Sequence, residues 1–309
     1  MRSSKWLILA GACSYGILST FVVFAYDQGF TVDEVVGGQN FLGFLLMALT
    51  FGMSRLAAKK KAASAPSGFG RLSIGNKLRG RDYAGLLAVG LLMASTGMLY
   101  YGALSYIPAS LAIVLLFQFT WIGVLIDALL LRRRPSGLEW GSIAVLFAGT
   151  LLAGGVVGSG LGEVKPLGIL LGLGSAVTYG LFILLSGRVA PGGAPLSRSL
   201  TMSLGSVTLT FLVYPPVFLT NGALLNGLLL WALLLALFGA VIPTLFYAIG
   251  VPGTGGTLAS ILSAAELPTA VLMSAFVLRE SVTLLQWFGV LVILAGIVLP
   301  EWSKLRGSR

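Results

Sequence analysis

Long apolar runs alternate with short polar or turn-rich breaks along the whole chain. A helix needs ~20 mostly apolar residues to cross the hydrocarbon core of a bilayer. Most breaks are too short to hold a separate soluble domain, so the pattern predicts an all-α membrane protein with ten transmembrane helices. These are expected at residues 6–25, 35–54, 83–105, 108–131, 139–158, 166–187, 199–219, 227–249, 255–278 and 284–302.

The first apolar run follows Arg2 and Lys5, as the core of a signal peptide would. However, it continues past Cys13 to about residue 25, which is longer than a typical signal-peptide core. The run is therefore interpreted as the first transmembrane helix.

Basic residues are distributed very unevenly over the connections. With the amino terminus inside, 18 of the 20 Lys and Arg residues lie on the cytoplasmic side, and only Lys165 and Arg279 lie outside. Cytoplasmic loops of membrane proteins carry such an excess. Both termini are therefore expected in the cytoplasm, in a multi-pass membrane protein. Eight of the basic residues fall in a cytoplasmic loop at residues 55–82, expected to be a flexible linker at anionic headgroups.

Composition narrows the function classes. The chain is 57% hydrophobic and only 10% charged, against roughly 25% charged in soluble domains. It has no histidine, and its single cysteine, Cys13, excludes an internal disulfide. No P-loop or GxSxG motif is present. These features indicate neither an enzyme, a cofactor, a metal site nor ATP-driven transport, and the net charge of +10 is assigned to membrane contacts rather than to nucleic acid.

An internal repeat divides the chain. Residues 131–152 align with residues 278–299 at a constant offset, which pairs Arg132 with Arg279, Trp140 with Trp287, and Ala148-Gly149 with Ala295-Gly296. Earlier in each half, Ser14-Tyr15-Gly16 resembles Thr178-Tyr179-Gly180. The expected domains are residues 1–158 and 159–309, each with five helices. Because five is odd, the second repeat is expected to be inverted in the membrane, an arrangement typical of transporters with a binding site between the halves.

Several of these residues also form a recognisable signature. Glu266-Leu267-Pro268, Leu278-Arg279-Glu280, Gln286-Trp287 and Leu294-Ala295-Gly296 resemble the terminal signature of EamA-like transporters in the drug/metabolite transporter superfamily, and residues 99–109 resemble that family's third-to-fourth helix junction. The resemblance implies a ten-helix inner-membrane carrier for small metabolites, often an exporter.

Glu266 is the deepest charge in the predicted spans. A carboxylate at the bilayer centre costs at least ~2.5 kcal/mol, so Glu266 is expected to be protonated, paired, or facing a wet cavity. One hypothesis makes it a substrate-binding or proton-coupling group. The other has it bond the backbone carbonyls that Pro268 leaves without donors.

Other polar and aromatic positions are weaker candidates. Gln118, beside Trp121, could contact a substrate or form an interhelical hydrogen bond. The tyrosines at repeat-related positions could line the same cavity or pack in the core; they are Tyr15, Tyr179, Tyr100 and Tyr247. Pro243 and Pro268 could act as gating hinges or simply bend their helices.

Two further acidic residues have structural interpretations. Asp127 is expected to pair with Arg132 and Arg133 near the cytoplasmic end of the fourth helix. Glu139 is expected to stabilise the start of the fifth helix, where the helix dipole favours a carboxylate.

Together these features favour an alternating-access secondary transporter for a small organic metabolite. An amino acid or a related neutral or zwitterionic solute fits best, with export suggested by the resemblance and protons as a coupling partner left open. Monomer and homodimer both remain open. The competing functions are an organic-cation exporter with Glu266 as counter-ion, and a passive channel or lipid scramblase.

Overall fold

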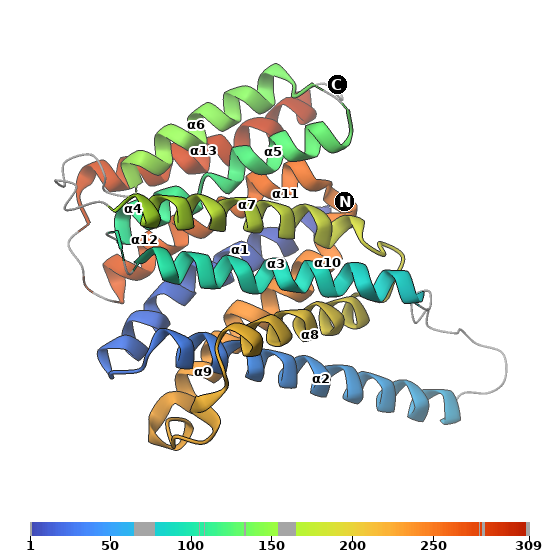
Figure 1. The fold of residues 1–309 in the computed structure, drawn as a ribbon. Coiled ribbons are helices and arrows are strands. Elements are labelled where there is room, and N and C mark those ends of the chain that lie inside the picture. Colours follow the sequence, from blue (N-terminus) through green and yellow to red (C-terminus); the bar gives the residue numbers. More distant parts are fainter. Residues whose placement is uncertain are drawn as a thin grey trace.

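A computed structural model describes residues 2–64, 78–104, 106–107, 109–132, 134–153, 165–277, 279 and 282–306 of the chain. Helices dominate these residues (Figure 1). The α-helices are α1 (Arg2–Asp27), α2 (Val32–Ser64), α3 (Gly80–Leu104), α4 (Ala109–Leu116), α5 (Phe119–Leu130), α6 (Gly137–Ala153), α7 (Pro166–Arg188), α8 (Pro195–Val213), α9 (Leu229–Leu235), α10 (Ile242–Thr254), α11 (Gly256–Ser263), α12 (Glu266–Phe276) and α13 (Leu284–Arg306). A 3-10 helix, η1 (Val217–Leu219), and two π-helices, η2 (Leu224–Leu228) and η3 (Ala236–Val241), lie between α8 and α10.

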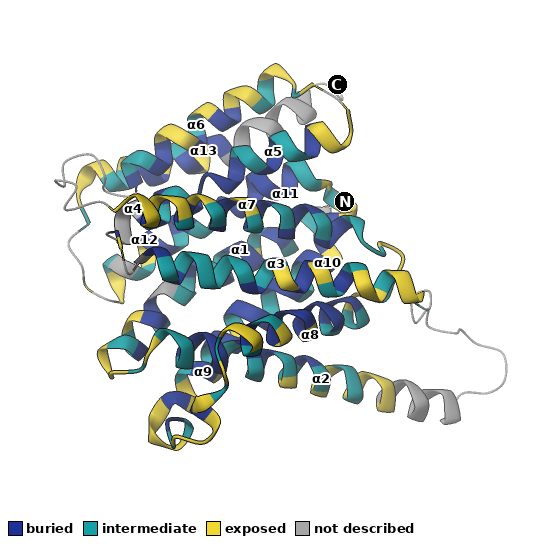
Figure 2. Ribbon diagram, viewed as in Figure 1, coloured by how far each residue is buried: buried dark blue, intermediate teal, exposed yellow. Residues whose placement is uncertain are grey.

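Over the described residues, eight helical stretches are long and apolar enough to cross a membrane. Two shorter apolar helices, Gly137–Ala153 and Leu284–Gly296, fall where the fifth and tenth spans were predicted. Large apolar side chains such as Leu225, Phe276 and Leu284 remain largely exposed on the outer faces, as expected for surfaces that contact lipid (Figure 2). The chain is therefore an all-helical, multi-pass membrane protein.

Two predicted boundaries need correction. Helix α2 continues ten residues beyond the predicted end of the second span, so Arg55 and residues 59–61 lie on a helix rather than in a linker. Residues 65–77 of the predicted loop, and 154–158 of the fifth span, lie outside the described residues. Helix α8 ends at Val213 instead of residue 219, because Pro215 and Pro216 cannot donate the amide hydrogen bonds that would continue it.

Two of the predicted spans are interrupted in the middle. The fourth span is split into α4 and α5 by a turn at residues 117–118, and the ninth into α11 and α12 by a turn at residues 264–265. In the ninth span the turn leaves Pro268 in the first turn of α12, where a missing amide is tolerated. The eighth span likewise passes through π-helical turns before Pro243, in the first turn of α10.

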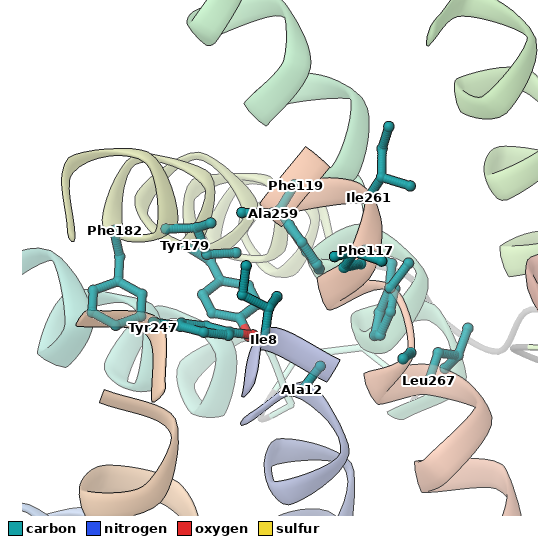
Figure 3. Packing of buried hydrophobic residues seen from close by; sticks show 14 of the residues in the cluster. Ile8, Ala12, Phe117, Phe119, Tyr179, Phe182, Tyr247, Ala259, Ile261 and Leu267 are labelled. Carbon is teal, nitrogen blue, oxygen red and sulfur yellow. The ribbon is translucent and has the colours of Figure 1, made fainter. Parts of the chain in front are cut away.

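The helices pack closely because small residues face one another. Helix α3 packs against α7 and α8, α1 against α10 and α12, and α6 against α13. A Cβ atom built on Gly90 of α3 would lie 1.9 Å from the carbonyl oxygen of Met202 in α8, so any side chain there would separate the two backbones. The main buried cluster lies where α1, α5, α7, α10 and α11 meet (Figure 3).

Candidate functional site

A pocket of about 520 Å³ lies among α1, α2, α3, α4, α7, η3 and α12. This volume is within the range of small-molecule sites. The pocket reaches from Tyr15 and Glu266, in the middle of their spans, to Tyr26 and Val32 at the α1–α2 turn. Its wall is mainly apolar. We call it the central pocket.

Glu266 is the first residue of α12, directly after the turn that interrupts the ninth span. Its carboxylate lines the central pocket, and its Oε2 accepts a hydrogen bond from Tyr179 Oη of α7 at 2.9 Å. The helix interruption thus presents the carboxylate to a cavity. Its partner, the Tyr179 hydroxyl, is neutral. The carboxylate can therefore accept hydrogen bonds from a second group as well.

Three of the four predicted tyrosines gather around this carboxylate. The Tyr15 ring lies edge-on to Tyr179, with centroids 5.7 Å apart, and 6.1 Å from Tyr247. Tyr247 is buried, shares a hydrogen bond with Ser263 at 2.9 Å, and does not line the pocket. Figure 3 shows Tyr179 and Tyr247 converging on the same space. Tyr100 lines the pocket farther along, with its ring centroid 5.9 Å from that of Tyr101.

Gln118 and Trp121 lie at the α4–α5 turn rather than along the pocket lining. The Gln118 backbone amide donates to Leu115, as in a 3-10 turn, and its side-chain Nε2 donates to the carbonyl of Val114 at 2.8 Å. Trp121 Nε1 in turn donates to Gln118 Oε1 at 2.7 Å. The Gln118 side chain therefore gives the Val114 carbonyl a hydrogen bond in place of the Gln118 amide, which bonds Leu115 at the turn.

The two candidate hinge prolines are both buried. Pro243 and Pro268 do not line the central pocket, and each lies within the first turn of its helix. They therefore mark the points at which the eighth and ninth spans change geometry.

The pocket also uses residues that were not singled out from the sequence. Tyr26, Gln39, Thr96 and Tyr101 contribute polar atoms to its lining. Asn40 lies in the wall too, but its Nδ2 donates to Thr210 at 2.9 Å and its Oδ1 accepts from Ser206 at 3.1 Å. Repeat symmetry could not find these residues, because they lie on α2 or toward one end of the pocket.

Carboxylates stand next to the pocket at the α1–α2 turn. Asp27 is exposed, and Asp33 and Glu34 follow Val32 in the first turn of α2. Glu34 accepts hydrogen bonds from the Thr31 amide at 3.1 Å and from Asn221 Nδ2 at 2.7 Å. Burial and then the charge of Asp33 raise the pKa of Tyr214, which lies just beyond the end of α8. We call Asp27, Asp33 and Glu34 the acidic mouth.

At the opposite end of the bundle, Asp127 of α5 joins the two halves of the chain. It accepts hydrogen bonds from Arg188, at the end of α7, and from Thr257, in the first turn of α11. The prediction linked Asp127 to Arg132 and Arg133; among the described residues it forms an ion pair with Arg188 of another helix, and Arg133 lies outside the described residues. Asp127 and Arg188 also line a second cavity of about 400 Å³ at this end.

Two other charged residues hold helix ends. Glu139 forms a capping box with Ser136 at the start of α6, with bonds of 2.7 and 3.2 Å, as its predicted role requires. Arg198 was counted among the basic residues at the cytoplasmic surface, yet only 1% of it is exposed. It donates to the carbonyls of Ala248, at 2.5 Å, and Ser186, and so ties α8 to α7 and α10.

Comparisons with known proteins agree with this architecture. Residues 166–300 match the EamA-like transporter family. A protein of the cyanobacterium Synechocystis sp., named as an uncharacterized transporter, is 26% identical over 234 residues, which cover 72% of this chain and 68% of the relative. A solved crystal structure, described only as that of a protein, has a TM-score of 0.75 and 16% identity, with both chains covered completely. At that identity the likeness shows the fold alone.

The family match falls on the repeat in which the Glu266 signature was identified, and the named relative extends the likeness over most of the chain. The predicted resemblance is confirmed: this chain is a membrane transporter, and its residues 166–300 match the EamA-like transporter family.

Proposed function

We propose that the protein is an alternating-access secondary transporter whose two inverted five-helix halves, residues 1–158 and 159–309, enclose the central pocket as the solute site. In this proposal each interrupted span counts as one crossing, and the shorter helices α6 and α13 add two crossings to the eight longer ones, which makes ten. The observation that carries the proposal is the Glu266 carboxylate, which faces a pocket of solute size in the middle of the spans.

Reciprocal contacts between α6 and α13 support the twofold relation of the halves. A Cβ atom on Gly149 would meet Ile293 at 2.7 Å, and one on Gly296 would meet Leu146 at 3.0 Å. Gly149 corresponds to Gly296 and Leu146 to Ile293 at the same repeat offset. An exchange of equivalent contacts of this kind is expected where a twofold axis relates two repeats.

Helices α1 and α7 make a second reciprocal pair. A Cβ atom on Gly16 would meet the Glu266 carbonyl oxygen at 2.5 Å, and one on Gly180 would meet that of Phe119 at 3.5 Å. Glu266 and Phe119 are the first residues of α12 and α5. Each half thus supplies the helix that packs on the interruption in the other half.

The directions of α1 and α7 favour inversion. Ser4, near the start of α1, lies beside Gly250, while Gly187, near the end of α7, lies beside Val251. The start of one helix and the end of its counterpart therefore lie together, and the pair runs antiparallel. The ends of α1 and α13 that carry the chain termini also lie on one side of the molecule (Figure 1), as an even number of crossings requires.

The pocket extends to only one end of the bundle, which favours a carrier over a channel. Between Tyr179 and the Asp127–Arg188 pair, buried side chains fill the space; they include Ile8, Ala12, Val124 and Leu184. A channel needs a continuous polar path. We infer an outward-facing state if the termini are cytoplasmic, since the central pocket reaches the α1–α2 end.

The solute that fits this site is a small organic molecule with an amino group. Glu266 and Tyr179 together offer a charge-assisted contact to an ammonium, and the tyrosines offer faces for an apolar body. Amino acids and related compounds meet this description, with export as the direction suggested by the family resemblance. Organic cations meet it too, because no Lys or Arg is found among the described residues that line the pocket.

The remaining partners follow from the surroundings of the site. We expect an inner-membrane location, with anionic headgroups at the basic residues between α2 and α3. Protons are the proposed coupling ion, because the Glu266 carboxylate can bind and release one.

Counterflow tests the carrier mechanism. Purified protein is first screened with a metabolite panel for thermal stabilisation, and each hit is then loaded into proteoliposomes. We expect saturable uptake of labelled solute that internal unlabelled solute accelerates. Flux that neither saturates nor responds to solute on the far side would instead identify a channel.

A further inference from the structure

The charge of the central pocket is negative. Glu266 is its one charged side chain among the described lining residues, and neither Lys nor Arg is present there. Moving an ion from water into such a site is costly unless an opposite charge receives it. An ammonium group has such a partner in Glu266, whereas a solute carboxylate would face it without a cation of its own.

Backbone amides do not supply the missing positive charge. Interrupted helices in transporters can direct free amide groups at an anionic solute. Here the amides of Ala264, Ala265 and Leu267 already donate to carbonyls three residues earlier, and Pro268 has no amide hydrogen. The turn beside Glu266 therefore offers no cluster of free amides to a carboxylate.

The side-chain amide of Asn40 in the wall is also occupied. Asn40 Nδ2 donates to Thr210, and Asn40 Oδ1 accepts from Ser206. Thr96 Oγ1 donates to the Leu92 carbonyl at 2.9 Å and lies 2.9 Å from Thr178 Oγ1. Asn40 and Thr96 thus use their polar atoms within the protein, and the Tyr26 hydroxyl, which has no hydrogen-bond partner among the described residues, is neutral and supplies no positive charge to an anion.

The tyrosine faces suit a cation. Tyr15 and Tyr26 of α1 and Tyr100 and Tyr101 of α3 line the pocket. Aromatic faces attract organic ammonium groups through the negative charge density of the ring. The remaining wall is apolar and fits a hydrocarbon or aromatic body.

The entrance to the pocket also carries negative charge. The acidic mouth, Asp27, Asp33 and Glu34, adjoins the lining residues Tyr26 and Val32. No Lys or Arg occurs in the sequence between Lys5 and Arg55, so these carboxylates have no basic neighbour on α1 or on α2 up to Arg55. A cleft lined by one sign of charge raises the local concentration of the opposite ion.

We propose that the central pocket selects an organic amine cation with an apolar body over the zwitterionic amino acid or the carboxylic acid of the same body. The inference rests on the proposed transport function and narrows its substrate class. It leaves the mechanism unchanged if it fails.

Matched solutes that differ only in charge test this selectivity. The panel contains phenethylamine, phenylalanine and 3-phenylpropionate, then tryptamine with tryptophan, and cadaverine with lysine. Each is tested on the purified full-length protein for thermal stabilisation and for saturable counterflow in proteoliposomes. For at least one aromatic body we expect the amine to bind at least about tenfold more tightly than its amino acid, with no binding of the acid.

The variants connect the selectivity to the carboxylate. Glu266→Gln is expected to reduce amine binding at least about tenfold and to remove the preference for the amine. Glu139→Gln makes the same chemical change at the α6 capping box and should leave the preference intact. If Glu266→Gln fails to fold, Tyr179→Phe, which removes only the hydroxyl next to the carboxylate, should weaken amine binding more than binding of an uncharged analogue such as 2-phenylethanol.

Three results would overturn the inference. An amino acid that outcompetes its amine, a preference that survives in Glu266→Gln, or the absence of binding by every amine in the panel each contradicts it. In the first case saturable counterflow of the amino acid still supports the carrier. If no amine binds, the labelling of single cysteines from the two sides of the membrane, which requires no solute, tests the carrier mechanism independently.

Discussion

Two carboxylates within the helices have opposite arrangements. Asp127 is paired with Arg188 and also bound by Thr257, so its charge is already compensated within the protein. Glu266 is bound by the neutral hydroxyl of Tyr179 and lines the pocket. A carboxylate without a cationic partner is the one that can receive a charged group from outside, which is why Glu266 is assigned to the solute and Asp127 to the protein.

Gln118 shows a polar side chain in a structural role at a helix interruption. In Gln118→Leu, the Val114 carbonyl and the Trp121 indole each lose a partner in a buried setting. We expect the stability to fall by ~1–3 kcal/mol, measured as a lower melting temperature of the purified protein, because a buried group without its hydrogen bond carries that cost. Solute affinity per folded molecule should remain near that of the wild type. A normal melting temperature with lost binding would instead show that Gln118 contacts the solute.

The charged and aromatic residues of the site could be predicted from the sequence, whereas the geometry of the pocket could not. Glu266 and the tyrosines at positions 15, 100 and 179 could be selected because charge and aromatic repeats are visible in the sequence, and these four line the pocket. Gln39 and Tyr26 could not be selected, because their participation depends on which face α2 presents and where α1 ends. Arg198 could not be recognised as buried, since its partners are backbone carbonyls of other helices.

At the scale of elements, interruptions in two helices bring the site together. Apolar runs predict that a helix exists, but they do not predict a turn within it. The α4–α5 turn has no proline at the position of Pro268, where Trp121 stands instead, so no breaker signalled it. Its stability comes from the Gln118 side chain, whose hydrogen bonds are visible only in the folded chain.

Two equivalent glycines offer a matched test of helix packing. A Cβ atom at Gly16 would lie 2.5 Å from a backbone oxygen, whereas one at Gly180 would keep ordinary contacts of 3.5 Å. We expect Gly16→Ala to destabilise the protein by ~1–3 kcal/mol through overpacking, and Gly180→Ala to have little effect. Thermal denaturation of the two variants in the same detergent makes the comparison. Equal loss in both would contradict the difference in contact between α1–α12 and α7–α5.

The ion pair between α5 and α7 is expected to hold one end of the bundle closed. Asp127→Asn removes the charge while keeping the size of the side chain. A charge-assisted hydrogen bond contributes ~1.5 kcal/mol, so opening of this end should become about tenfold more frequent. In a chain with Cys13→Ala, a cysteine in place of Leu258, which lines the second cavity, reports opening through its rate of labelling by a membrane-impermeant maleimide.

Glu139→Gln is the control for this experiment, because Glu139 lines the same cavity and caps α6. It should leave the labelling rate unchanged. If Asp127→Asn also leaves it unchanged, the ion pair does not restrain that end.

At the scale of the whole molecule, the inverted arrangement makes a definite topological prediction. The ends of α1 and α7 should face opposite sides of the membrane, although the two helices begin equivalent repeats. Single cysteines at Gln28, after α1, and at Pro191, after α7, both lie at exposed positions. With Cys13→Ala, impermeant maleimide should label one in right-side-out vesicles and the other only in inverted vesicles. Labelling of both from the same side would refute the inverted halves.

The same approach tests alternating access without a known solute. A cysteine at Thr96, in the central pocket, should be labelled from one side in the wild type and from the other side when Asp127→Asn favours opening. Labelling from both sides at equal rates in one preparation would indicate a continuous channel.

The most direct test of the central claim is solute counterflow by the wild type, Glu266→Gln and Glu139→Gln in matched proteoliposomes that contain equal amounts of folded protein. We expect saturable counterflow for the wild type and for Glu139→Gln, and its loss, or the loss of its pH dependence, for Glu266→Gln. Wild-type counterflow and pH dependence in a well-folded Glu266→Gln would contradict the assignment of the central pocket as the transport site.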